Sequence, residues 1–63
     1  MASHEEALET ARDGYERADA AKEAADQARV RAAHDAHEDG WALRRIARHL
    51  GVSHTIVARL LRR

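Results

Sequence analysis

Large apolar residues are concentrated in the second half of the chain, at the spacing of short amphipathic helices. Three of them, Leu43, Ile46 and Leu50, recur together with the small Ala47 at intervals of three and four residues. This spacing predicts a two-turn helix that buries one face. Gly51 follows directly, and glycine readily adopts the left-handed conformation that ends a helix. The pattern therefore predicts a helix that stops at position 51.

A second short helix is predicted from His54 to about Arg62. Ser53 precedes it and is a favourable N-cap, because its side-chain oxygen can accept a hydrogen bond from the first turn. Val52 and Val57 flank this cap as a hydrophobic staple. The apolar residues expected to face the preceding helix are Ile56, Val57, Leu60 and Leu61. Two short helices joined by a tight turn are thus expected in the last third.

The first half has a different pattern, with few large apolar residues and many strong helix formers. Ser3 and Glu6 have the spacing of a capping box, which marks a helix start. The chain contains no proline. We therefore expect one long helix from Ser3 to about Glu38, roughly 50 Å long at about 1.5 Å per residue. A break, if present, is expected near Gly14 or near residues 26–28.

Small residues occupy one face of this predicted helix at alternating intervals of four and three. They are Ala7, Ala11, Gly14, Ala18, Ala21, Ala25, Ala28 and Ala32. Such spacing is typical of a coiled-coil seam, and the first six residues are the expected dimer seam of a homodimer. However, an alanine-rich helix produces this spacing readily, and methyl groups bury little area. A solitary helix, or one packed within its own chain, therefore stays an alternative.

Charge is divided unequally between the two halves. Residues 1–40 hold all eleven acidic residues and five basic ones, whereas residues 41–63 hold six arginines and no acid. An acid-free basic segment favours contact with nucleic acid, and the acidic half is expected to stay away from phosphate.

Size and composition exclude several classes of protein. A chain of 63 residues without cysteine has neither a disulfide framework nor a cysteine zinc site. No apolar run approaches the roughly 18 residues that span a bilayer. We expect one small domain that is soluble and cytoplasmic, associated with the nucleoid and without membrane contact. Fifteen alanines, and ten arginines among eleven basic residues, are typical of a GC-rich bacterial or phage genome.

Enzymatic chemistry is not indicated by any residue pattern. No nucleophile–base pair, paired carboxylates or phosphate-binding glycine loop can be assembled, so we expect no enzyme and no small-molecule substrate. His34 and His37 lie three residues apart and could begin a metal site, but no further ligand is placed nearby. We expect no metal and no cofactor.

The segment LRRIARHLGVSHTIVARL, residues 43–60, carries a resemblance to a known family. It resembles the helix-turn-helix of the DNA-binding domain at the C-terminus of serine recombinases (resolvases and invertases). It is also similar to related small bacterial helix-turn-helix regulators. The resemblance covers about residues 28–62, with Ala47 at the helix crossing, Gly51 in the turn and Gly40 after the preceding helix. It implies a trihelical DNA-binding unit at residues 28–63. Together with the helix predicted for the first half, it gives an all-α chain in which an acidic, alanine-rich arm (1–27) runs into this unit.

The resemblance also implies how the unit would meet double-stranded DNA. The helix at 54–62 would enter the major groove as the recognition helix, and the middle helix would cross the backbone. The implied base contacts are Ser53, His54, Thr55 and Arg59. Arg59 could pair with a guanine edge, and Thr55 could contact a base or a thymine methyl. The other arginines of residues 41–63 are expected to contact phosphates: Arg44, Arg45, Arg48, Arg62 and Arg63.

The chain also departs from that family. These 63 residues leave no room for a recombinase catalytic domain, Ala42 replaces the Ser or Thr that usually caps the middle helix, and we expect an acidic helix before the unit instead of a basic arm. We therefore expect a small sequence-specific DNA-binding protein, a homodimeric transcriptional regulator. Two alternatives remain: a coiled-coil adaptor whose helix-turn-helix binds a protein, and an accessory DNA-binding factor of a phage or plasmid.

Overall fold

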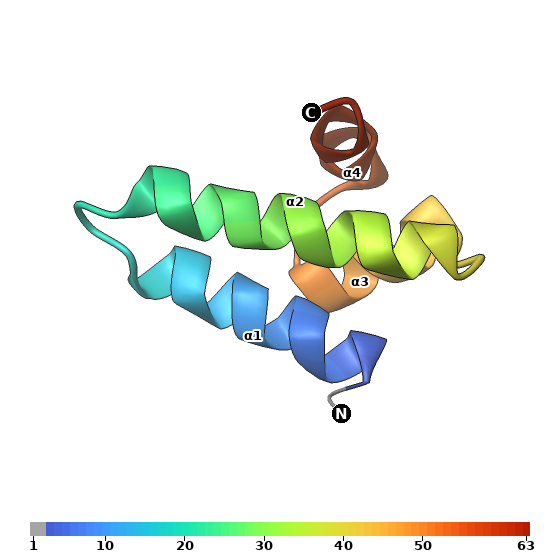
Figure 1. Cartoon of the computed structure of the whole chain (residues 1–63), viewed down its shortest axis with the longest axis horizontal. Helices are drawn as coiled ribbons and strands as arrows, with labels where there is room; N and C mark the ends of the chain where they lie inside the picture. Colours follow the sequence, from blue (N-terminus) through green and yellow to red (C-terminus); the bar gives the residue numbers. More distant parts are fainter. Residues whose placement is uncertain (1–2) are drawn as a thin grey trace.

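The computed structural model describes residues 3–63, which form four α-helices and no strand. The helices are α1 (His4–Arg17), α2 (Lys22–Glu38), α3 (Leu43–Leu50) and α4 (His54–Leu61). The all-α prediction is therefore confirmed. Figure 1 shows α1 and α2 side by side in opposite directions, with α3 behind this hairpin and α4 across α2 on the other side from α1. The molecule measures 32 × 27 × 17 Å.

The prediction of one long helix from Ser3 to Glu38 is wrong. The chain leaves the helix at Ala18, whose backbone is extended (φ −78°, ψ 124°), and enters α2 at Lys22. The break thus lies at residues 18–21, not near Gly14 and not near residues 26–28. The N-terminal half is a helical hairpin instead of an extended arm.

Burial of Leu8 explains why the hairpin forms in spite of good helix formers at the break. Leu8 has 0% of its surface exposed and Ala11 has 7%, and both belong to the core that α2, α3 and α4 share. Fully burying a leucine contributes about 1.5–3 kcal/mol. Helix propensities differ by only tenths of a kcal/mol between ordinary residues, so packing decides the conformation at 18–21.

Contacts of Tyr15 hold the two arms of the hairpin together. The Lys22 ammonium donates to the Tyr15 carbonyl at 2.8 Å, and its Nζ lies 4.1 Å from the centre of the Tyr15 ring. The Arg29 guanidinium stacks on the same ring, with Cζ 3.6 Å from its centre. In a straight helix Tyr15 and Arg29 would lie about 21 Å apart, so this contact requires the turn.

One hydrophobic core joins all four helices. Its largest fully buried side chains are Leu8, Ile46, Leu50 and Val57. Trp41, only 9% exposed, covers one side of it from the connection between α2 and α3. The expected domain boundary after residue 27 lies inside α2, and the first two residues of the expected arm are outside the described part of the chain.

The predicted N-caps of α1 and α4 and the predicted end of α3 are confirmed. The Ser3 and Ser53 side chains accept hydrogen bonds from the backbone amides of Glu6 and Ile56, at 3.2 and 3.3 Å. Gly51 is left-handed at φ +69°, and the amide of Val52 donates to the Ala47 carbonyl at 3.1 Å. These signals depend on a few neighbouring residues, which is why the sequence reveals them.

Replacing Gly51 with alanine should lower the free energy of unfolding by about 1–2 kcal/mol, because its φ disfavours any residue with a Cβ. A Cβ there would also lie 3.2 Å from Cδ of Arg12, on α1. Gly14 is the matched control, because it lies inside α1 with open space around the position of a Cβ. Gly14→Ala should stabilise the protein by about 0.5–1 kcal/mol. Urea unfolding of both variants measures the difference, and a stabilising Gly51→Ala would contradict the turn geometry.

Candidate nucleic-acid interface

The side of α4 that faces solvent carries most of the expected base contacts. His54, Thr55 and Arg59 are exposed, whereas Val57 and Leu60 on the opposite side are buried. Ser53 is exposed as well, and its hydroxyl oxygen is engaged as the N-cap of the helix. Val57 and Leu60 thus hold α4 in the core, and the polar side chains of its other side face solvent.

Four of the five expected phosphate-binding arginines have no ionic partner within residues 3–63. Arg44 and Arg48 are exposed on α3, and Arg62 is exposed just after α4. Arg45 is exposed too, but its guanidinium lies over the Trp41 ring, with Cζ 3.6 Å from the ring centre. This stacking orients Arg45 without neutralising its charge.

Arg63 differs from the other arginines because an acid of α2 binds it. Its Nη1 donates to Oδ2 of Asp26, and its backbone carbonyl oxygen lies 3.1 Å from Nε2 of His34. The C-terminal residue is therefore held against α2. Sequence reasoning missed this contact because Asp26 lies 37 positions earlier.

Histidine–carboxylate pairs attach α1 to the rest of the molecule. Nδ1 of His49 lies 2.8 Å from Oε2 of Glu9, and Nε2 of His4 lies 2.5 Å from Oδ2 of Asp39. Both imidazole rings contact Trp41, at centroid distances of 5.5 and 5.7 Å. His49 is therefore a structural contact between α3 and α1, which no local sequence signal indicates.

His34 and His37 contact backbone oxygens instead of forming a metal cluster. Nε2 of His34 lies 3.1 Å from the Arg63 carbonyl oxygen, and Nδ1 of His37 lies 3.4 Å from the Trp41 carbonyl oxygen. Within residues 3–63, no group of three or more acidic, histidine or cysteine side chains could hold a metal ion.

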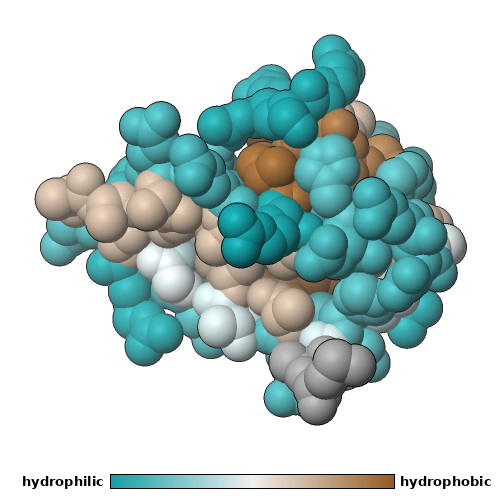
Figure 2. Space-filling view, in the orientation of Figure 1, coloured by the Kyte–Doolittle hydropathy of each residue, from teal (hydrophilic) through white to brown (hydrophobic). Residues whose placement is uncertain are grey.

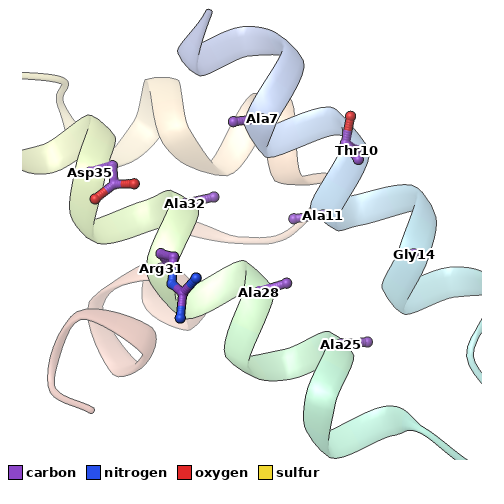
Figure 3. A pocket seen from close by; sticks show the side chains of 9 residues that line it. All are labelled: Ala7, Thr10, Ala11, Gly14, Ala25, Ala28, Arg31, Ala32 and Asp35. Carbon is purple, nitrogen blue, oxygen red and sulfur yellow. The ribbon is translucent and has the colours of Figure 1, made fainter. Parts of the chain in front are cut away.

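The expected dimer seam is divided between the two arms of the hairpin. A groove of about 300 Å³ runs between α1 and α2 (Figure 3), and small residues line it: Ala7, Ala11, Gly14, Ala25, Ala28 and Ala32. Ala18 and Ala21 lie instead at the break between the helices. Figure 2 shows a pale band of weakly hydrophobic and neutral residues along the hairpin, bordered by hydrophilic ones. The seam is thus a groove within one chain.

Comparison with protein-family models, with curated proteins and with solved structures found no match to this chain. The arrangement of its own residues is therefore the basis for the function proposed below. No helix within residues 3–63 has the length and apolar character that crossing a bilayer requires.

Proposed function

We propose that the protein is a sequence-specific DNA-binding regulator that acts as a homodimer in the nucleoid. In this proposal α2, α3 and α4 form a trihelical helix-turn-helix, α4 lies in the major groove and α3 crosses the backbone. One observation carries the proposal: α4 is anchored by buried Val57 and Leu60 while Thr55 and Arg59 face solvent.

The junction of α3 and α4 supports this assignment. Ala47 is 5% exposed and belongs to the core that α3 and α4 share, so a small residue stands where the two helices meet. Gly51 then turns the chain in the left-handed conformation and Ser53 caps α4. A crossing of this kind directs one side of the second helix outward, as insertion into a groove requires.

The charge of this surface fits a phosphate backbone. Arg44, Arg48 and Arg62 are exposed and unpaired with acids of the described chain, and residues 41–63 contain no acidic residue. Each phosphate contact steepens the dependence of log affinity on log salt by about 0.9. Four or five arginine contacts per chain therefore predict a slope between about −3.5 and −4.5 for each bound chain. Gel retardation over a salt series tests the proposal, and a protein that retards no DNA at low salt would support the adaptor alternative.

Arg62 and Arg63 should differ in their contribution to DNA affinity although they are neighbours. Arg62→Ala should reduce the salt slope by about 1 per chain, because an exposed guanidinium is removed from phosphate. Arg63→Ala should change the slope by clearly less, because Asp26 already binds that guanidinium. Equal losses for the two variants would contradict the role of the Asp26 contact.

Two copies are proposed to meet at the groove between α1 and α2. Arg31 and Asp35 border this groove, are exposed and form no ion pair within residues 3–63. In a two-fold interface, Arg31 of each copy can meet Asp35 of the other, because isologous contacts are reciprocal. The small lining residues let the second hairpin approach closely.

Ala28→Glu should weaken self-association at least about tenfold, because it places a charge inside the apolar groove. Ala28 is exposed in the single chain, so the substitution should leave the fold intact. Ala24→Glu is the matched control, since Ala24 is exposed on the same helix outside the groove. Sedimentation equilibrium measures both. A wild-type protein that stays monomeric at millimolar concentration, or equal effects of the two variants, would contradict this interface.

A further inference from the structure

A second cavity lies between the hairpin and α4, and we call it the α4 cleft. Its volume is about 330 Å³, close to the lower limit of pockets that hold small organic ligands. Val52, Ile56 and Leu60 supply its apolar surface, while Tyr15 of α1 borders it from the hairpin. The cleft is therefore formed by segments from both halves of the chain, and α4 is one of its walls.

Arg29 is the unusual residue of this cleft. Only 9% of its surface is exposed, and arginine is almost never this buried unless it is paired. Nη2 donates to Oδ1 of Asp26 at 2.7 Å and the guanidinium stacks on Tyr15, but the buried Nε has no acceptor within the described chain. A buried donor without a partner costs about 1–3 kcal/mol. Arg29 thus lines the cleft with a guanidinium whose charge Asp26 balances only in part, because Asp26 also binds Arg63.

The charge around the cleft is unbalanced. Arg29, Arg59 and Arg63 all line it, and Asp26 is the only acidic residue among the lining residues. Asp26 already accepts from both Arg29 and Arg63, so Arg59 has no acid partner there. Guanidinium groups bind carboxylates through planar, charge-assisted hydrogen bonds. Three cations beside an apolar surface fit an anion that carries an apolar body.

We propose that the α4 cleft binds a small organic carboxylate. Its acid group would meet the guanidinium groups of Arg59 and Arg29, and its aromatic or aliphatic body would cover Ile56 and Leu60. Arg59 is also the principal candidate for reading a base. Binding of the acid would therefore withdraw Arg59 from DNA and lower DNA affinity. This last step rests on the proposed function, whereas the binding of the acid does not.

Titration of the full chain with three acids, in the absence of DNA, tests the binding. The probes are benzoate, indole-3-acetate and octanoate, each compared with its neutral amide, and inorganic phosphate is the anion without an apolar body. NMR reports the site directly, because Tyr15 is the only tyrosine and Trp41, outside the cleft, is the only tryptophan. We expect at least one acid to shift the Tyr15 ring signals and to bind at least about tenfold tighter than its amide and than phosphate.

Variants locate the binding to the cleft. Arg59→Ala and Arg29→Met should each weaken the acid at least about tenfold, and Arg59 is exposed, so its loss leaves the core intact. Arg17→Ala is the matched control, because Arg17 is exposed on α1 and does not line the cleft. If Arg29→Met does not fold, the affinity of the Arg59→Ala variant for the acid and the comparison of each acid with its amide decide whether the acid binds in the cleft. The proposal is overturned if no acid binds at millimolar concentration, if amides bind equally well, or if Arg59→Ala has no effect.

The effect on DNA is measured separately. A saturating concentration of the acid should lower DNA affinity at least about fivefold, and the amide should not. In a folded Arg29→Met variant this effect should disappear while DNA binding itself persists. If the acid binds but DNA affinity does not change, the α4 cleft is still a ligand site, and the proposed effect of the ligand on DNA binding is wrong. Absence of DNA binding under all conditions would reject the proposed function and leave the ligand site standing.

Discussion

Replacing Leu8 with alanine should lower the free energy of unfolding by about 2–5 kcal/mol. Leu8 is completely buried in the core together with Ile46 and Leu50, which belong to α3. The substitution removes the methine and the two methyl groups of the side chain and leaves a cavity between α1 and the rest of the molecule. A domain of this size has little stability to lose, so the variant is expected to be partly unfolded at 25 °C. Urea unfolding followed by Trp41 fluorescence measures the change.

Thr10→Ala is the control for this experiment, because Thr10 is exposed on the same helix. Its effect should stay within about 0.5 kcal/mol. An extended arm would leave Leu8 in solvent, and Leu8→Ala would then be as mild as Thr10→Ala. Equal stability of the two variants would therefore contradict the hairpin and favour a separate arm.

Replacing Arg59 with alanine should cost about 1–3 kcal/mol in binding to the preferred DNA site. The loss should concentrate at one base pair, so that all four bases become nearly equivalent at that position. The physical reason is that a bidentate guanidinium distinguishes guanine from the other bases by its two acceptors. Binding measured against a panel of single-base variants of the site reads this change directly.

Arg48→Ala is the matched comparison, because Arg48 is exposed on α3 and is expected at phosphate. It should weaken all sequences alike, leave the base preference intact and reduce the salt slope by about 1. If Arg59→Ala instead weakened all sequences alike, α4 would not be the helix that reads bases.

Local signals were sufficient to predict the second half of the fold. The ends of α3 and α4 follow from Gly51, Ser53 and the apolar spacing of Ile46 and Leu50, all of which act within a few residues. The exposed positions of Thr55 and Arg59 follow from the same periodicity. Where helix ends and burial depend on neighbours in sequence, the sequence is informative.

The hairpin could not be predicted in this way. No glycine or proline marks residues 18–21, and strong helix formers surround them. The break depends on contacts that are distant in sequence, such as Tyr15 with Arg29 and Leu8 with the core. A heptad seam of small residues is compatible with a partner helix from the same chain or from another, and the pattern alone does not distinguish them.

Charged contacts over long separations were missed for the same reason. Asp26 engages Arg63 from 37 positions away, and Glu9 engages His49 from 40 positions away. Acidic side chains of the hairpin thus bind basic side chains in the second half, although composition had suggested that the two halves divide their roles. The α4 cleft exists only because of this packing, so only the structure could reveal it.

Selection of bound sequences from a random pool of double-stranded DNA tests the central claim most directly. The wild-type protein should enrich one defined motif, in two inverted copies if the hairpin groove joins two chains, and Arg59→Ala should enrich a motif degenerate at one position of each copy. A pool that stays random after repeated selection, with the protein folded and the salt low, would contradict the claim that α4 reads DNA sequence.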